Sequence, residues 1–291
     1  PHPDLTEPTN RIIAFQDIIN NRTSPYDDNG HGTHVSGDIA SNGLRSQGTY
    51  RGPAPDASLI GVKVLDKYGM GSTSEVIAGL TWAVENRDKY KIRILSMSLG
   101  STASTSYRDD PLAMAVENVW QENIVVCVAA GNSGPGERTV NSPGIAPSVI
   151  TVGALDDRIT LPPAGNIIAD FSSRGPTVDE LTKPDVVAPG VNVVSLRSPG
   201  SMLDKKNKNS RINSWYISMS GTSMATPVCS GVCALLLEAN PGLMPDNVKN
   251  IIMETASSLN LDPNTQGAGL VDAKRALEIA LQEKQINVFK K

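Results

Sequence analysis

Cysteine is scarce in this chain: its 291 residues include only Cys127, Cys229 and Cys233. An odd number of cysteines, all within apolar stretches, argues against a disulfide framework. We expect three buried free thiols, with Cys229 and Cys233 four residues apart on one helix. Free thiols suit a reducing compartment, so the sequence favours a cytoplasmic protein over a secreted one.

Long apolar runs and an excess of basic charge are also absent. No apolar run approaches the roughly 20 residues that span a bilayer, so we expect no membrane partner. The 26 basic and 30 acidic residues give a formal net charge of −4, which argues against a nucleic-acid partner. The apolar share of 39% and the charged share of 19% are typical of a globular chain.

Strand-like and helix-like patterns alternate along the first half of the chain. Ser72 and Glu75 have the spacing of a capping box, and a helical apolar stripe follows them. Continuous apolar runs, which suit parallel strands covered on both faces, occur at residues 11–15, 58–65, 92–97, 124–130 and 148–152. These repeated units predict an α/β fold of three layers, doubly wound around a central, mostly parallel sheet.

The second half of the chain has a different composition. Residues 172–214 are rich in Pro, Gly, Ser and Asn, and we expect them to be mostly loop. Within them, residues 204–209 form a basic stretch that we interpret as a solvated, mobile surface loop. Helices are predicted over 223–238, 246–256 and 272–282, and residues 284–291 are expected to form a loose tail. We predict a single domain over residues 1–291.

The strongest chemical signal is the segment 221–227, which reads GTSMATP. It places Ser223 in the first turn of a helix that follows a glycine. There the hydroxyl is fixed, and neighbouring backbone N–H groups have no helical partner. Ser223 is therefore a candidate nucleophile. A plain Ser/Thr helix cap is the competing interpretation.

A second segment, 27–37, reads DDNGHGTHVSG and carries His31 and His34 where a polar loop enters a helix. Histidine moves protons near neutral pH, and the glycines beside His31 leave room for a substrate, so His31 is a candidate general base. A zinc site on the two histidines lacks a third histidine, a glutamate between them and a cysteine pair, and is disfavoured. A capped helix with core histidines suits His34 better than His31.

The third segment, 127–134, reads CVAAGNSG, a strand of small residues that ends at Asn132. The amide N–H₂ of Asn132 can donate to an oxyanion, jointly with the backbone N–H of Ser223. A turn asparagine without a catalytic role is the competing interpretation. Nucleotide binding at the glycine-rich turn 131–136 is a remote alternative, because the turn lacks the dinucleotide fingerprint.

The order and the residues of these three segments resemble the subtilisin family of serine peptidases. Further strings shared along nearly the whole chain are HPDL at 2–5, GPAP at 52–55, SMSLG at 96–100, FSSRGP at 171–176 and PDVVAPG at 184–190. The resemblance implies a subtilisin-like fold with a central sheet of about seven strands. It also implies a serine endopeptidase that hydrolyses peptide bonds through an acyl-enzyme, with Ser223 as nucleophile, His31 as general base and Asn132 in the oxyanion hole.

The resemblance further implies how a polypeptide substrate binds: extended between two backbone segments, as an added strand. The substrate-binding residues that it implies are Gly69, Met70, Gly71, Ser98, Leu99, Gly100, Ala129, Ala130 and Gly131. The last three are small and uncharged, which predicts a preference for a large apolar side chain before the cleaved bond. Thr73 and Val76 predict a roomy, permissive pocket farther from that bond.

No cofactor is implied for the chemistry, but the resemblance leaves room for a structural calcium or sodium ion. The residues concerned are Asp4 at one place and Gly144, Ala146, Val149 and Asp185 at another. The loop 41–52 lacks the asparagine-rich calcium loop of secreted subtilisins. A carboxylate loop without metal is at least as compatible with the sequence.

The catalytic aspartate of the family lies on a strand just before the string that here occupies residues 2–5. None of the first four aspartates of this chain matches that motif, so the resemblance places the aspartate upstream of Pro1. We expect an N-terminal fragment or a longer parent chain to supply it, and an inhibitory pro-segment is a further implied partner. The alternative function is an inactive pseudo-protease that retains the peptide groove.

Overall fold

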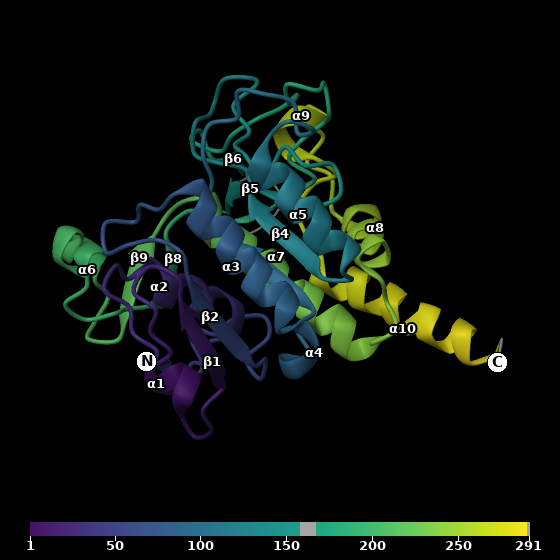
Figure 1. Ribbon diagram of the computed structural model, residues 1–291. Helices are drawn as coiled ribbons and strands as arrows, with labels where there is room; N and C mark the ends of the chain where they lie inside the picture. Colours follow the sequence, from purple (N-terminus) through teal and green to yellow (C-terminus); the bar gives the residue numbers. More distant parts are fainter. Residues whose placement is uncertain (158–166, 290–291) are drawn as a thin grey trace. The chain divides into compact units, whose positions relative to one another are not determined.

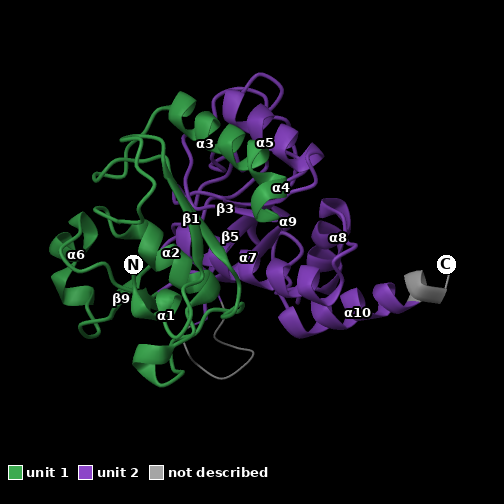
Figure 2. Ribbon diagram, turned by 60° about the horizontal axis from the view of Figure 1, so that its bottom comes forward, with its two compact units in different colours: residues 1–92, 192–220 green, residues 93–191, 221–291 purple. Residues whose placement is uncertain are grey.

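The computed structural model describes residues 1–157 and 167–289, and the chain divides into two compact units (Figure 2). Unit 1 comprises residues 1–92 and 192–220, and unit 2 comprises residues 93–191 and 221–291. Figure 1 follows their helices and strands in chain order. The single domain over residues 1–291 stays a prediction.

Unit 1 is built on two parallel strands, β1 (Ile12–Asp17) and β2 (Leu59–Lys63). Helix α2 (His31–Ala40) follows β1 and packs on β8 (Val193–Leu196), which pairs antiparallel with β9 (Tyr216–Met219). The shorter helices of this unit are α1 (Pro3–Thr6), η1 (Leu44–Ser46), α4 (Arg87–Tyr90), α6 (Met202–Lys206) and η2 (Lys208–Ser210).

Helix α3 (Thr73–Glu85) begins with the predicted capping box. The side chain of Ser72 accepts a hydrogen bond from the Glu75 backbone N–H at 3.2 Å, and the Glu75 carboxylate accepts one from the Ser72 backbone N–H at 2.6 Å. These two bonds satisfy two N–H groups that the first helical turn leaves without partners.

Unit 2 contains a sheet in which β3 (Ile94–Met97), β4 (Val125–Ala129) and β5 (Ile150–Asp156) are parallel neighbours. On β5, β7 (Val186–Pro189) adds in parallel and the short β6 (Ile167–Ile168) in antiparallel orientation. Every residue of β4 is buried, as expected for a parallel strand covered on both faces.

Helix α7 (Thr222–Ala239) packs against β3, β4, β5 and β7. By length and composition alone it could cross a membrane, but 67% of it is buried inside the protein, so we interpret it as a core helix. The remaining helices of unit 2 are α5 (Pro111–Gln121), α8 (Pro245–Thr255), α9 (Pro263–Gln266) and α10 (Ala273–Phe289).

Residues 172–214 are mostly loop, as predicted, with the short elements β7, β8, α6 and η2 between the loops. Two other expectations about the second half of the chain need correction. The stretch 204–209 is largely exposed, as expected, but it lies in α6 and η2 instead of a loop, and its Asp204 is buried between Arg197 and Arg211. Residues 284–289 continue α10 instead of forming a loose tail, and residues 290–291 lie outside the described residues.

Several strands have a strand partner on one edge only, and β2 and β3 are among them. Among the described residues, β2 pairs with β1 alone, and β3 pairs with β4 alone. The backbone N–H and C=O groups of an open edge need partners. A further strand can therefore add to β2 and to β3.

Candidate active site

Ser223 is the second residue of α7. Within unit 2, Ser98 hydrogen-bonds both its side-chain hydroxyl and its backbone carbonyl. Its Oγ donates to the carbonyl oxygen of Ser98 at 3.3 Å. In return the Ser98 hydroxyl donates to the carbonyl oxygen of Ser223 at 2.7 Å. Four residues further on, Pro227 has no N–H to offer to that carbonyl. The Ser98 hydroxyl thus takes the place of the helical hydrogen bond that Pro227 cannot make, a role the sequence did not reveal.

Asn132 is held by the residue that precedes the serine. Its Oδ1 accepts hydrogen bonds from the backbone N–H of Thr222 at 2.9 Å and from the Thr222 hydroxyl at 3.0 Å. Because Oδ1 serves as acceptor twice, the Nδ2 group keeps its donors for another partner. Thr222 was not singled out from the sequence, although it belongs to the GTSMATP string.

The donor groups of Asn132 and Ser223 flank the same point. An ideal Cβ on Gly221 would lie 3.6 Å from Asn132 Nδ2 and 3.6 Å from the Ser223 backbone nitrogen. The Ser223 N–H lies in the first helical turn, where no carbonyl of the helix reaches it. Two N–H donors beside the nucleophile, with only a glycine between them, can hold an oxyanion.

The residues Ala129, Ala130 and Gly131 line the exit of β4 and are buried. An ideal Cβ on Gly131 would come within 2.8 Å of Asn141 Cγ and of Ser173 Oγ, and the φ of Gly131 is +110°. Only glycine fits this turn, since an L side chain would be strained and would collide.

The segment of Ser98, Leu99 and Gly100 leaves β3 with free backbone groups. Within residues 1–157 and 167–289, the N–H and C=O groups of Leu99 and Gly100 have no hydrogen-bond partner. An ideal Cβ on Gly100 would lie 2.6 Å from the Ser142 carbonyl oxygen, so a side chain there would displace the segment. Such a free edge is what an extended peptide needs for strand addition.

In unit 1, His31 is the first residue of α2, and Asp27 shapes the loop that leads to it. One oxygen of the Asp27 carboxylate accepts from the backbone N–H groups of Asn29 at 3.1 Å and Gly30 at 2.7 Å. The other accepts from the N–H and the hydroxyl of Thr33 at 2.8 and 2.6 Å. These bonds satisfy N–H groups of the loop and of the first turn of α2, so Asp27 holds in place the loop that leads to His31.

The half-buried His31 ring has no hydrogen-bond partner among the described residues. The pKa of His31 is lowered to about 4, chiefly by burial and also by the nearby His34, while the Asp27 carboxylate acts in the opposite direction. A base must be unprotonated to accept a proton, and this ring is neutral at physiological pH. No carboxylate described here binds the ring and orients it.

His34 is a core histidine, as the competing interpretation of the HGTH segment predicts. Its side chain is fully buried, with Nδ1 2.9 Å from the Asp38 carboxylate and Nε2 3.2 Å from the carbonyl oxygen of Ile217. Both ring nitrogens are engaged, so His34 has none left for a zinc ion shared with His31.

Gly69, Met70 and Gly71 form an exposed segment that follows a turn closed by Asp66. The Asp66 backbone N–H donates to the Met70 carbonyl at 2.7 Å, and the Asp66 carboxylate accepts from the Met70 N–H at 3.0 Å. Gly69 has a φ of +80°, which favours glycine. An aspartate that hydrogen-bonds the backbone a few residues on is a common turn signal, and it could have been found in the sequence.

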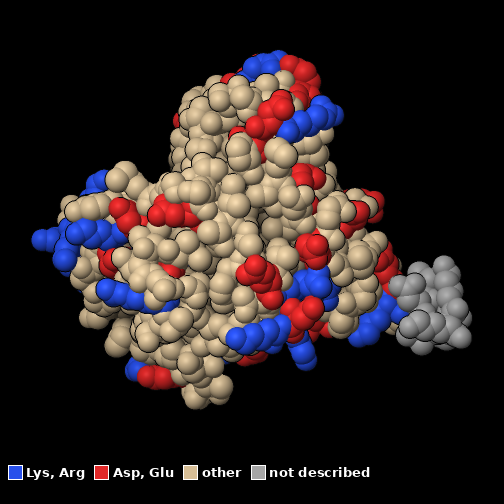
Figure 3. All heavy atoms as spheres, in the orientation of Figure 1, with Lys and Arg blue, Asp and Glu red and all other residues tan. Residues whose placement is uncertain are grey.

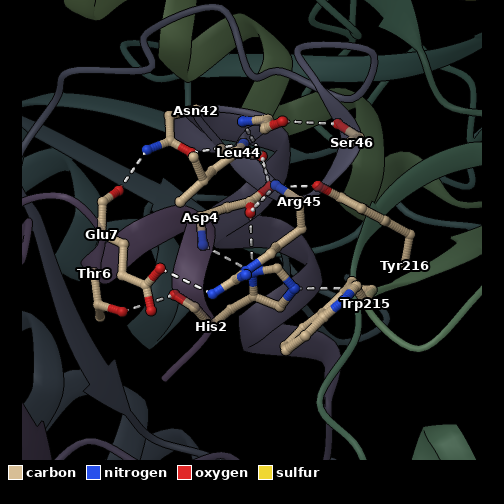
Figure 4. A network of polar contacts seen from close by, with 12 residues as sticks. His2, Asp4, Thr6, Glu7, Asn42, Leu44, Arg45, Ser46, Trp215 and Tyr216 are labelled. Atoms are coloured by element: carbon tan, nitrogen blue, oxygen red, sulfur yellow. Dashed lines mark hydrogen bonds and ion pairs between the residues drawn. The ribbon is translucent and has the colours of Figure 1, made fainter.

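The carboxylate of Asp4, the first candidate calcium ligand, is fully buried and surrounded by donors of unit 1 (Figure 4). Its Oδ2 accepts from the hydroxyls of Tyr216 at 2.6 Å and Ser41 at 3.0 Å, and its Oδ1 accepts from the Arg45 backbone N–H at 3.0 Å. The His2 ring accepts from the Asp4 N–H and has its other nitrogen 3.0 Å from the Trp215 carbonyl.

Asp185, the second candidate, has lysine ammonium groups on both carboxylate oxygens. Lys183 Nζ donates to Oδ2 at 2.6 Å and to the Val149 carbonyl at 3.1 Å. Lys249 Nζ lies 3.1 Å from Oδ1 and donates to the carbonyls of Val149 at 3.0 Å and Pro147 at 2.7 Å. Donors already occupy the oxygens that would bind a cation, so neither Asp4 nor Asp185 fits a metal site as these residues are arranged.

The three cysteines are free and buried, as predicted. Their sulfur atoms lie within 4.8 Å of one another, and Cys127 Sγ is 3.9 Å from Cys233 Sγ. A disulfide needs sulfur atoms about 2 Å apart, so these are neighbouring thiols in the core between β4 and α7.

A serine in the first turn of a core helix, an asparagine amide beside its N–H and a histidine that opens another helix are features of subtilisin-like serine peptidases. The chain belongs to the subtilase family, whose model matches residues 2–269. The family resemblance and the α/β fold predicted from the sequence are thereby confirmed.

Among known relatives, the chain is 53% identical over 283 residues to serine protease AprX of Bacillus subtilis (strain 168), which covers 95% of this chain and 63% of AprX. It is 36% identical over 275 residues to subtilisin Savinase of Lederbergia lenta, covering 94% of this chain and 86% of Savinase. The solved structure of sphericase matches with a TM-score of 0.76 and 31% identity, over 93% of this chain and 86% of sphericase.

The chain is shorter than several of these relatives. It spans 63% of the length of AprX and 64% of that of the thermostable alkaline protease of Halalkalibacterium halodurans.

Proposed function

We propose that this chain is the peptidase domain of a serine endopeptidase. In the proposed reaction Ser223 Oγ bonds to the carbonyl carbon of the substrate, and His31 takes the hydroxyl proton. The C–N bond then breaks, and His31 gives the proton to the leaving amine. In the second half of the reaction, water attacks the acyl carbon while His31 takes a proton from the water. The bond to Ser223 Oγ then breaks, and His31 returns the proton to the serine.

The observation that carries this proposal is the pair of N–H donors beside the nucleophile. Asn132 Nδ2 and the Ser223 nitrogen each lie 3.6 Å from the position that an ideal Cβ on Gly221 would take, and Thr222 holds the amide through its oxygen, which leaves the N–H₂ group to face that position. Donors that are oriented before the reaction stabilise the negative charge of the tetrahedral intermediate without any rearrangement.

We propose that the carboxylate that orients His31 comes from a segment upstream of Pro1. Two features of the described residues support this. Asp27, the carboxylate that influences the pKa of His31, is committed to its own loop. In addition, β2 and β3 each have an edge without a strand partner, where a strand that carries the carboxylate can add.

The proposed substrate is an extended polypeptide with a large apolar residue before the cleaved bond. The free backbone groups of Leu99 and Gly100 support strand addition, and the small wall at Ala129, Ala130 and Gly131 supports the side-chain preference. The exposed segment of residues 69–71 is the proposed second strand. Hydrolysis rates for peptides that differ only in this residue test the preference, and equal rates for Phe, Ala and Asp would contradict it.

An inhibitory pro-segment and a cytoplasmic location are further parts of the proposal. The free, buried thiols support a reducing compartment. On the face shown in Figure 3, basic and acidic side chains are interspersed. This distribution supports a polypeptide substrate over a nucleic acid.

The proposal is tested by labelling the complete protein, with its upstream segment, using a fluorophosphonate probe. We expect one adduct, on Ser223, which disappears in Ser223→Ala and persists in the neighbouring control Ser133→Ala. Replacing the upstream aspartate by asparagine is expected to lower kcat about 3 × 10⁴-fold, the factor known for loss of the aspartate in subtilisin. A complete protein that forms no adduct would instead be a peptide-binding pseudo-protease.

A further inference from the structure

We propose that this protein has replaced the cations of both candidate sites by donors of its own chain, so that its stability does not depend on calcium. The replacement is different at the two carboxylates. At Asp4 it consists of hydroxyl and N–H groups, and at Asp185 it consists of two lysine ammonium groups. The inference concerns stability and is independent of the proposed catalytic function.

At Asp4 the number of available oxygen ligands decides the matter. Calcium takes about six to eight oxygen ligands, to which surrounding loops usually contribute carbonyl groups. Here the backbone carbonyls of the loop 41–52, beside the carboxylate, accept hydrogen bonds from N–H groups of the same loop. The Ser41 carbonyl accepts from the Gly52 N–H at 2.9 Å, and the Gly43 carbonyl accepts from the Gly48 N–H at 2.9 Å.

The same side chains could not serve a metal ion without losing these bonds. Tyr216 directs its hydroxyl proton at Asp4 (Figure 4). The Ser41 hydroxyl lies between the Asp4 carboxylate, at 3.0 Å, and the Tyr50 carbonyl, at 2.8 Å, and both side chains are buried. Burial of the ring and the hydrogen bond to the Asp4 carboxylate raise the pKa of the Tyr216 phenol, so the phenol keeps its proton. The carboxylate is therefore solvated by neutral donors, as a buried charge requires.

At Asp185 the charge itself is replaced. Lys183 and Lys249 carry two positive charges against one carboxylate, the same sum that a calcium ion would bring. They also take the neighbouring carbonyls, because both donate to Val149. The remaining candidate oxygen, the Gly144 carbonyl, accepts from the Thr151 hydroxyl at 2.7 Å.

A lysine ammonium group differs from a bound calcium ion in how the stability of the protein depends on calcium concentration. A bound ion stabilises the native state by mass action, so that stability rises with the logarithm of its concentration above the dissociation constant. An ammonium group on a side chain has no such dependence. Calcium addition and removal should therefore leave the unfolding temperature of this protein unchanged.

The first test is thermal unfolding of the complete protein carrying Ser223→Ala, which prevents self-digestion. We expect the same Tm, within about 1 °C, in excess EDTA and across a calcium series up to millimolar concentrations. Equilibrium dialysis with calcium should find no ion bound per chain. A Tm that rises with the logarithm of calcium concentration, and that loses this response in Asp4→Asn or Asp185→Asn, would overturn the proposal.

The second test removes the ammonium groups. In the Lys183→Met/Lys249→Met double variant we expect a lower Tm that calcium or sodium partly restores, because Asp185 and the Val149 carbonyl then become free ligands. The control, Lys205→Met/Lys206→Met, changes two exposed lysines of α6 and should show neither effect. A folded double variant that no cation stabilises would contradict the replacement at Asp185. If that variant does not fold, Lys249→Met alone is compared with the same control.

Discussion

Thr222 holds the side chain of Asn132 by two hydrogen bonds to a single oxygen, across 90 residues of sequence. The backbone N–H of Thr222 lies 2.9 Å from Asn132 Oδ1, and its hydroxyl lies 3.0 Å from the same atom. The residue next to the nucleophile thus orients the amide that is proposed to stabilise the oxyanion. This makes Thr222 a positioning residue, because it acts through Asn132.

Removing only the Thr222 hydroxyl should weaken this hold. We expect Thr222→Val to lower kcat about tenfold with little change in KM, less than the roughly 10²- to 10³-fold that loss of the donor itself would cost. Thr222→Ser keeps the hydroxyl and is the control. If both variants have the kcat of the parent, Asn132 needs no support from this side chain.

The hydroxyl of Ser98 replaces the helical hydrogen bond that Pro227 cannot donate to Ser223. We expect Ser98→Ala to lower the free energy of unfolding by about 1–3 kcal/mol, since it leaves the carbonyl of Ser223 without a partner. Ser98→Thr retains a hydroxyl and should lose less. Denaturant unfolding of both in the Ser223→Ala background measures the difference, and equal losses would show that the hydroxyl is not what matters.

The pKa of His31 reports whether a carboxylate partner is present. In the chain described here the ring should titrate near 4 in an NMR pH series. Adding the upstream segment with its aspartate should raise this pKa, because a carboxylate favours the imidazolium form. A titration midpoint that does not change would contradict the proposed source of the carboxylate.

The lowered pKa of His31 also fixes the sign of its effect on stability. The folded pKa of about 4 lies below the ordinary histidine pKa of 6.5, so the unfolded chain binds the proton more tightly. The contribution of His31 to stability is therefore lost as pH falls from about 6.5 towards 4. His31→Gln should remove this part of the pH dependence.

Asp204 is predicted to be a major stabilising charge of unit 1. Its carboxylate accepts from Arg197 Nε at 2.5 Å and from Arg211 Nε at 2.7 Å, and Asp204→Asn leaves both guanidinium groups without a counter-charge. We expect a loss of about 3 kcal/mol. The control Asp88→Asn, at an ion pair whose carboxylate is 89% exposed, should cost less than about 0.5 kcal/mol.

The hydrogen bonds from Arg197 hold the pKa of Asp204 well below its usual range. A depressed carboxyl pKa contributes stability that is present above the unfolded value, about 3.9, and is lost as pH falls below it. The difference in unfolding free energy between the parent and Asp204→Asn should therefore shrink in acid. A difference that stays constant down to low pH would show that Asp204 stabilises by packing.

The sequence by itself determined the family, the strand and helix pattern, and the candidate residues His31, Asn132 and Ser223. These rest on short strings and local periodicity, such as GTSMATP or the capping box at Ser72, in which every part lies within a few residues. The buried thiols also followed from their apolar neighbours. Such features depend on local sterics and burial, which a linear pattern records.

Only the tertiary structure decided which groups neutralise the buried carboxylates and hold the catalytic side chains. The stretch from Asp204 looked solvated because its lysines dominate the local composition, yet its aspartate turns inward to Arg197 and Arg211. Lys249 reaches Val149 across 100 residues, and Ser98 reaches Ser223 across 125. Any complementary group can pair with a charge or a hydroxyl. The partner therefore depends on which residues, distant in sequence, the fold brings into contact.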